Sequence, residues 1–379
     1  MTNERTIHVA ITIDDTGRAQ FAQTDGGLVS PMATGMMTNV AAALNGRGPS
    51  FANFDAPFDA DYTSRKGYLA DFLGAGANAV PLPLLSDALE AEAAPLIRPV
   101  TGNKHVLNYL GMSVVMNARR RWALYSAANI DFANRFAMRR PTDVWRTDPR
   151  ILADHQVGEF YYTRNQFDRG HLTRREDMEY GVTRMAALQQ AADTCHFTNA
   201  VPQHARFNQN TQLWQGLERH LLEDSISRES FRAQVFTGPI LSEGDPVYAR
   251  APKIQYPVRF WKVAVAVTSR GKLFAAAFML DQTDVITQYG IEATEIPFGP
   301  FKTYQVKVAE IERLTGLTFR CGADGKGRLS SFDPLETVRP RPAMPRPGPQ
   351  PGPFESIVTE SAPNGYVSIS ALEDVIGPD

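Results

Sequence analysis

Histidine, arginine, asparagine and glutamate side chains gather in three short motifs between residues 168 and 218. The first motif has the sequence DRGH (168–171), the second TNAVPQ (198–203), and the third FNQN (207–210), which leads on to Glu218. An imidazole whose pKa lies near neutrality can deprotonate a water molecule, and a guanidinium can hold a phosphate oxygen. Amide and carboxylate oxygens suit a hard cation such as Mg²⁺. The motifs therefore supply the parts that hydrolysis of a phosphodiester bond needs.

Each motif alone also has an ordinary structural interpretation. A single histidine or arginine is more often a core or surface residue, and an asparagine near the start of a helix is most often an N-cap. Glu218 precedes Arg219 and could be an exposed helix residue. The functional interpretation depends on the three motifs occurring together and in this order.

The ordered motifs resemble those of the DNA/RNA non-specific endonuclease family, the ββα-metal or His-Me finger nucleases. Four flanking segments agree with this resemblance, namely 145–149, 236–240, 260–263 and 311–317. The likeness covers roughly residues 97–320. It implies an α+β fold in which a mixed or antiparallel sheet is flanked by helices and a β-hairpin followed by a helix holds one Mg²⁺, with Mn²⁺ as a substitute.

The resemblance also implies a role for each motif residue. His171 corresponds to the general base, and Arg169 corresponds to the arginine at the phosphate. Asn199 corresponds to an asparagine that supports the histidine and the substrate. The asparagine that opens the helix is the direct metal ligand, and Glu218 holds a metal-bound water.

The spacing of the metal-binding motif departs from the family at one point. Counting forward from Asn199 assigns the metal ligand to Asn208, whereas counting back from Trp214 and Glu218 assigns it to Asn210. Two extra residues on a continuous helix would rotate Glu218 by about 200°, so a loop or bulge must absorb them. We prefer Asn208 because the local FNQ motif is intact there, and Asn210 is the alternative.

A second departure lies before Trp145. Several family members carry a phosphate-contacting arginine where this chain has Asp143. Arg146, or the pair 139–140, could compensate, and we assign Arg146 to substrate binding. The change bears on efficiency or substrate preference and leaves the basic chemistry in place.

Periodic apolar segments predict the elements that must position these motifs. Strands are predicted over 7–13, 112–116, 122–126 and the tyrosine-rich 159–163, a buried hairpin over 261–267 and 273–280, and helices over 211–224 and 305–314, the last ending at 315–316.

The change of composition along the chain predicts four regions. Residues 1–95 form an N-terminal extension or small domain, and residues 96–335 form the nuclease domain. A proline-rich stretch over 336–354 is an extended linker. The tail, 355–379, could dock back on the body or bind a partner.

Composition limits the classes of protein further. Hydrophobic residues make up 43% and charged residues 21%, which allows a sizeable core, and a net charge of −2 argues against gripping nucleic acid by bulk charge. Two cysteines, Cys195 and Cys321, are too few for a disulfide framework, and we interpret both as reduced, structural thiols. Neither a secretory signal nor a bilayer-spanning stretch is visible, so we expect no membrane association and a cytoplasmic location.

The main hypothesis is a Mg²⁺-dependent endonuclease that cleaves DNA and RNA with little regard for sequence. The alternative is a weak or inactive nucleic-acid-binding or scaffold protein on the same fold, suggested by Asp143 and the insertion. An indiscriminate nuclease would threaten its host, so residues 1–95 or the tail could restrain it, or bind a regulatory partner or inhibitor. The resemblance also leaves a homodimer open.

Overall fold

The computed structural model describes most of the chain between residues 58 and 337 and short stretches on either side. The described residues are 9–13, 19–23, 58–136, 138, 143–163, 165, 167–204, 232–248, 254–283, 302–337, 366–368 and 376. The chain divides into two compact units, one formed by residues 1–55 with 139–142 and the other by residues 56–138 with 143–379. In the first unit, β1 (Val9–Ile13) pairs antiparallel with β2 (Ala19–Gln23), which confirms a strand over 9–13.

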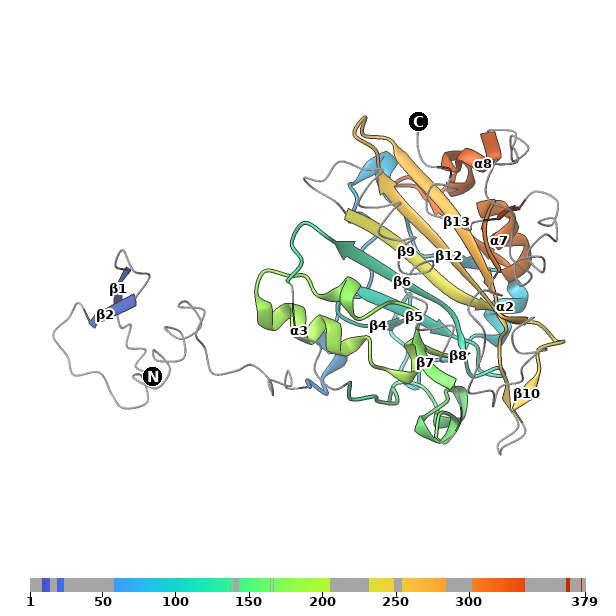
Figure 1. Ribbon diagram of the computed structural model, residues 1–379, viewed down its shortest axis with the longest axis horizontal. Coiled ribbons are helices and arrows are strands. Elements are labelled where there is room, and N and C mark those ends of the chain that lie inside the picture. Colours follow the sequence, from blue (N-terminus) through green and yellow to red (C-terminus); the bar gives the residue numbers. More distant parts are fainter. Residues whose placement is uncertain are drawn as a thin grey trace, which may run out of the picture. The chain divides into compact units, whose positions relative to one another are not determined.

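The second unit is built on an eight-stranded antiparallel sheet with the order β18-β14-β13-β12-β9-β6-β5-β4 (Figure 1). Its strands are β4 (Leu107–Asn108), β5 (Met112–Met116), β6 (Ala123–Asp131), β9 (Arg232–Ile240), β12 (Arg259–Val267), β13 (Leu273–Asp281), β14 (Lys302–Val306) and β18 (Val367–Ser368). The predicted strand over 112–116 and the predicted hairpin are confirmed, and β6 extends beyond its predicted end.

Both faces of this sheet are buried, so its central strands have nearly continuous apolar sequences. On one face, Phe260 and Ala264 pack in a core that includes Leu172, Met178 and Val201 from the segments around the DRGH motif. On the other face, Trp261 and its neighbours pack against the helix α7 (Val308–Thr315) and its surroundings. The sheet therefore forms the middle layer, and the site motifs lie in the layer on its first face.

The helices among the described residues are short. They are α2 (Asp87–Glu92), α3 (Arg184–Asp193), α7 and α8 (Pro334–Thr337). The Thr183 side chain caps α3 by accepting a hydrogen bond from the Ala186 amide. Gly316 ends α7 in the left-handed conformation (φ 74°), which confirms the predicted stop.

Paired short strands complete the unit. They are β3 (Leu84–Leu85) with β15 (Leu317–Thr318), β10 (Val247–Tyr248) with β11 (Ile254–Gln255), β16 (Arg320–Cys321) with β17 (Gly327–Arg328), and β7 (Phe167–His171) with β8 (Ala200–His204). Within the described part of the chain, no helix is both long and apolar enough to cross a bilayer.

The boundary predicted at residue 95 falls inside the second compact unit. Leu84–Leu85 pairs with Leu317–Thr318, and Tyr68, Val80 and Ala93 are buried in the core on the second face of the sheet. Part of the predicted N-terminal region therefore packs in the second unit. The sequence does not indicate this, because irregular backbone can join a core without showing any period.

The tail docks back on the body, which answers one alternative that the sequence left open. Val367–Ser368 pairs with β14 at the edge of the sheet. The Gln305 side chain donates to the carbonyl of Ile376 (2.9 Å) and accepts from its amide (2.8 Å). The tail thereby covers a strand edge that would otherwise be exposed.

Two predicted elements differ from the structure. Residues 159–161 form a 3₁₀ turn and not a strand, because Tyr161 is drawn into a cluster of aromatic rings. The helix predicted from residue 305 begins at Val308, since residues 302–306 pair as β14. The predicted helix over 211–224 lies outside the described residues.

Candidate active site

The first two motifs meet strand to strand. DRGH occupies β7 and TNAVPQ runs into β8, and the two strands lie side by side (Figure 1). They pair antiparallel, with His171 opposite Ala200 and Asp168 opposite Gln203. A two-stranded ribbon places the side chains of residues far apart in sequence within contact distance. The strand pairing therefore brings His171 and the segment around Asn199 together.

Close packing across this ribbon explains the glycine of DRGH. A Cβ at Gly170 would lie 2.3 Å from the carboxamide carbon of Gln203, whose side chain is buried. Only glycine leaves room for that carboxamide at this position. Gly170 of the first motif thus packs directly against the Gln203 side chain of the second motif.

Asn199 fastens the backbone around His171. Its side chain is fully buried, accepts a hydrogen bond from the Thr173 amide (3.0 Å) and donates to the carbonyls of Thr173 (2.9 Å) and Thr194 (3.0 Å). The Leu172 amide also donates to the Asn199 carbonyl (2.9 Å). Asn199 thus fixes backbone groups at Thr173 and Thr194, and its burial keeps its side chain from solvent.

His171 lies at the end of β7, half-buried beside an indole ring. The ring centroids of His171 and Trp145 are 4.6 Å apart. The Nε2 atom of His171 lies 3.8 Å from the Sγ atom of Cys195. Asp143 is the third member of this group, and the ligating atoms of the three side chains all lie within 4.8 Å of one another.

Arg169 points out of the same strand and is about one-third exposed. Its guanidinium forms an ion pair with Glu159, with an Nε–Oε2 distance of 3.0 Å. The ring centres of Trp145 and Tyr162 each lie 5.8 Å from the guanidinium carbon. Arg169, the candidate for phosphate binding, is therefore held by the Glu159 carboxylate, a group that a phosphate can replace as hydrogen-bond acceptor.

Arg146 is the second predicted substrate contact. Its guanidinium carbon lies 4.1 Å from the centre of the Phe58 ring, and its Nη1 donates to the Val144 carbonyl (2.7 Å). Its backbone bonds to Cys195 and Phe197, which ties it to the segment before β8. The sequence did not indicate Phe58 or Glu159, because aromatic and acidic residues in irregular segments carry no periodic signal.

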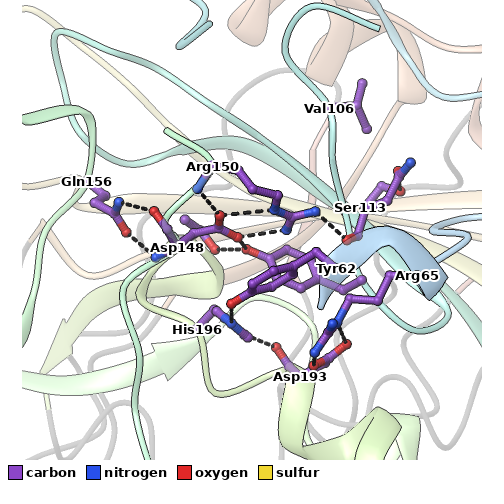
Figure 2. Close-up of polar contacts among 12 residues, drawn as sticks. Tyr62, Arg65, Val106, Ser113, Asp148, Arg150, Gln156, Asp193 and His196 are labelled. Carbon is purple, nitrogen blue, oxygen red and sulfur yellow. Dashed lines mark hydrogen bonds and ion pairs between the residues drawn. The ribbon is translucent and has the colours of Figure 1, made fainter. Parts of the chain in front are cut away.

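A buried polar network holds the segment that precedes β8 (Figure 2). The Tyr62 hydroxyl lies 2.8 Å from Nε2 of His196, and Arg65 donates to Asp193 (2.7 Å). Burial lowers the pKa of His196, and burial raises the pKa of Tyr62 to about 12, so both side chains are neutral at pH 7. Residues 58–65 thus clamp the loop that carries Cys195 and Asn199.

A second part of the network ties the same loop to the segment after Trp145. Asp148 accepts a hydrogen bond from the Tyr109 hydroxyl (2.6 Å) and pairs with Arg150 (2.7 Å), as Figure 2 shows for Asp148 and Arg150. The Tyr109 hydroxyl also lies 2.7 Å from the hydroxyl of Thr198. The ion pair and hydrogen bonds with Arg150 hold the pKa of Asp148 below its ordinary value, although burial opposes them.

The residues expected to hold the metal lie outside the described residues. These are Asn208, the alternative Asn210, and Glu218. As a donor set they offer amide and carboxylate oxygens, which is the all-oxygen chemistry that Mg²⁺ prefers. The chain leaves β8 at His204, a few residues before Asn208. The donor chemistry therefore fits Mg²⁺, and the assignment of the ligands stays a prediction.

Comparison with known proteins assigns the family. The family model for DNA/RNA non-specific endonucleases matches residues 92–326, which is more than half of the chain. The uncharacterized protein y4fB of Sinorhizobium fredii is 35% identical over 348 residues, covering 86% of this chain and 50% of the relative. The chain thus spans about half the length of the curated relative it matches. The solved EndoG/EndoGI complex is similar with a TM-score of 0.43 and 20% identity, covering 57% of this chain and 86% of that chain.

The chain belongs to the DNA/RNA non-specific endonuclease family. The resemblance inferred from the motifs is confirmed, and so is the α+β fold class, with a large antiparallel sheet and few helices.

Proposed function

We propose that this protein is a Mg²⁺-dependent endonuclease that hydrolyses phosphodiester bonds of DNA and RNA without regard to sequence. The observation that carries the proposal is the position of His171, at the end of β7 opposite Ala200 and fastened through the backbone by the buried Asn199. A fixed imidazole at the rim of a β-hairpin is suited to proton transfer from a water molecule.

The described side chains divide the work of hydrolysis. His171 accepts the proton of the attacking water at an imidazole nitrogen. Arg169 exchanges Glu159 for a non-bridging phosphate oxygen, and Arg146 supplies a second positive charge close by. Mg²⁺, held by Asn208 and through water by Glu218, would stabilise the charge that develops on the phosphate and the leaving oxygen. Contacts of both arginines to phosphate would carry no sequence information, as cleavage without regard to sequence requires.

Plasmid and RNA cleavage by the full chain tests this proposal. Wild type should cleave supercoiled plasmid and RNA with Mg²⁺ and should stop in EDTA. His171→Ala should lose at least about 10²-fold in rate, because the general base is removed. The matched control is His105→Ala, which removes another half-buried histidine, one that contacts Glu90, and should leave the rate unchanged. Equal cleavage rates of His171→Ala and wild type would overturn the assignment of His171 as the general base.

One observation favours a second candidate function, a nucleic-acid-binding protein with weak or lost chemistry. Asp143 puts a carboxylate beside the histidine, where the family pattern has an arginine. Binding of labelled DNA without cleavage, at high protein concentration and with Mg²⁺ or Mn²⁺, would support this alternative and contradict the enzyme.

Restraint of the nuclease by the N-terminal segment, and its presence in the cytoplasm, are further proposals. Because residues 58–95 belong to the body of the second unit, a deletion that tests restraint should remove only residues 1–55. A higher cleavage rate of the shortened chain supports restraint, and an unchanged rate contradicts it.

A further inference from the structure

Three side chains form a compact donor group, and the proposed hydrolysis uses only one of them, His171. Asp143, His171 and Cys195 come from three separate segments, and their ligating atoms lie within 4.8 Å of one another. Cys195 is buried with 1% of its surface exposed, and the Asp143 side chain is 16% exposed. The group is therefore closed on the thiol side and reachable on the carboxylate side.

The separation of the sulfur and nitrogen donors fits a small tetrahedral cation. Zinc bonds of about 2.3 Å to sulfur and about 2.0–2.2 Å to nitrogen or oxygen place neighbouring ligands about 3.3–3.7 Å apart in a tetrahedron. The Sγ–Nε2 distance between Cys195 and His171 is 3.8 Å, so this pair needs only a small closure. The Asp143 oxygen lies within 4.8 Å of both atoms and has to move closer by up to about 1 Å on binding. The donor set of sulfur, nitrogen and oxygen matches Zn²⁺ and does not match Mg²⁺, which binds oxygen.

The surroundings hold the group in place. The Trp145 ring packs against the His171 ring at 4.6 Å between centroids and limits its rotation. Arg175 is buried, and its Nη1 lies 3.9 Å from Asp143 Oδ1 and 4.0 Å from Cys195 Sγ. Burial, followed by the Asp143 carboxylate, raises the pKa of the Cys195 thiol to about 11, although Arg175 acts in the opposite direction. The protonated thiol and the positive charge of Arg175 both limit the affinity for a cation.

We propose that Asp143, His171 and Cys195 form an inhibitory binding site for Zn²⁺, separate from the catalytic metal. On binding, the Cys195 thiol gives its proton to solvent and its sulfur bonds the cation. Nε2 of His171 donates its lone pair to the same cation, and that nitrogen can then no longer accept a proton from water. The inhibitory consequence rests on the proposed function of His171, whereas the binding does not.

Metal binding is measured first, on the full chain and without nucleic acid. Zn²⁺ is titrated in competition with a chromophoric chelator, and Co²⁺ is added to reveal thiolate ligation through its sulfur-to-metal charge-transfer band. Wild type should bind one Zn²⁺ and show the band. Cys195→Ser should lose the band and at least about tenfold in affinity, since even the partners of metal ligands change affinity by about 10–100-fold.

Two further variants keep the binding test decisive. Cys321→Ser removes the other buried free thiol, which lies in β16, and should bind as wild type does. Asp143→Asn keeps the shape of a half-buried side chain and should weaken Zn²⁺ at least about tenfold. Thermal unfolding of each variant confirms that it is folded. The proposed site is contradicted if Cys195→Ser binds Zn²⁺ with wild-type affinity. It is also contradicted if only Cys321→Ser removes the Co²⁺ charge-transfer band.

Cleavage is measured second, with Mg²⁺ in excess and increasing Zn²⁺. Wild type and Cys321→Ser should be inhibited at the Zn²⁺ concentrations that saturate the binding curve. Cys195→Ser, compared with its own rate without Zn²⁺, should need at least about tenfold more. Equal inhibition of all variants would mean competition at the catalytic metal and would contradict the proposal. If the wild type does not cleave at all, the proposed function is contradicted. The binding experiment then still tests whether Asp143, His171 and Cys195 bind Zn²⁺.

Discussion

Asn199 offers the sharpest test of how the structure positions His171. Its side chain makes three hydrogen bonds to backbone groups, two at Thr173 and one at Thr194, in a fully buried place. Asn199→Ala removes all three. The orphaned Thr173 amide alone should cost about 1–3 kcal/mol, and the complete loss should cost about 3 kcal/mol or more.

Asn103 provides a matched control. Its side chain clamps one residue in the same way, accepting from the Val106 amide (2.7 Å) and donating to the Val106 carbonyl (2.9 Å), but it is only half-buried. Water can replace these bonds, so Asn103→Ala should cost about 1 kcal/mol. Urea unfolding followed by tryptophan fluorescence measures both variants. The reasoning is refuted if Asn199→Ala costs no more than Asn103→Ala.

An isosteric variant separates the hydrogen bonds from the packing. Asn199→Asp keeps the acceptor for the Thr173 amide but turns a carboxylate oxygen toward two carbonyls. The folded state then favours the protonated carboxyl, so it binds more protons than the unfolded state above about pH 4, and stability falls as pH rises. The deficit against wild type should grow by up to about 1.4 kcal/mol per pH unit from pH 4 toward neutrality. A deficit that is independent of pH would show that packing alone is responsible.

Three further variants test other parts of the structure. Glu159→Gln breaks the ion pair with Arg169 and should leave Arg169 available to phosphate. The KM for plasmid should fall by up to about fivefold, since an exposed ion pair contributes about 0.2–1 kcal/mol. Glu243→Gln breaks another exposed pair and is the control that should not change KM. Burial lowers the pKa of Lys262 from 10.5 to about 7, so between these values the unfolded state binds more protons and stability rises with pH. Lys262→Met should remove that rise, by about 1.4 kcal/mol per pH unit between about pH 7 and 9 in urea unfolding, and an unchanged slope would contradict a buried neutral lysine. Gly170→Ala brings a Cβ to 2.3 Å from a buried carboxamide carbon and should lower stability by about 1–3 kcal/mol in thermal unfolding, whereas wild-type stability would mean that the carboxamide moves aside freely.

The sequence predicted those parts of the fold that carry a strong local pattern. The hairpin of β12 and β13 was predicted because both strands are long apolar runs joined by a polar turn, and both faces of the sheet are indeed buried. The end of α7 was predicted because only glycine readily takes the left-handed conformation found at Gly316. The 3₁₀ turn over 159–161 was missed because tyrosines favour strands locally, whereas Tyr161 packs against rings that include the distant Trp122 and Tyr248.

The sequence by itself determined the family and the types of side chain available for chemistry, since the order of DRGH and TNAVPQ is legible without coordinates. Only the tertiary structure decided which residues touch them. It placed Asp143 and Cys195 beside His171, and it placed Glu159 against Arg169. The physical reason is that motif spacing records neighbours along the chain, whereas strand pairing and core packing select neighbours through space, without any local signal in the segments they join.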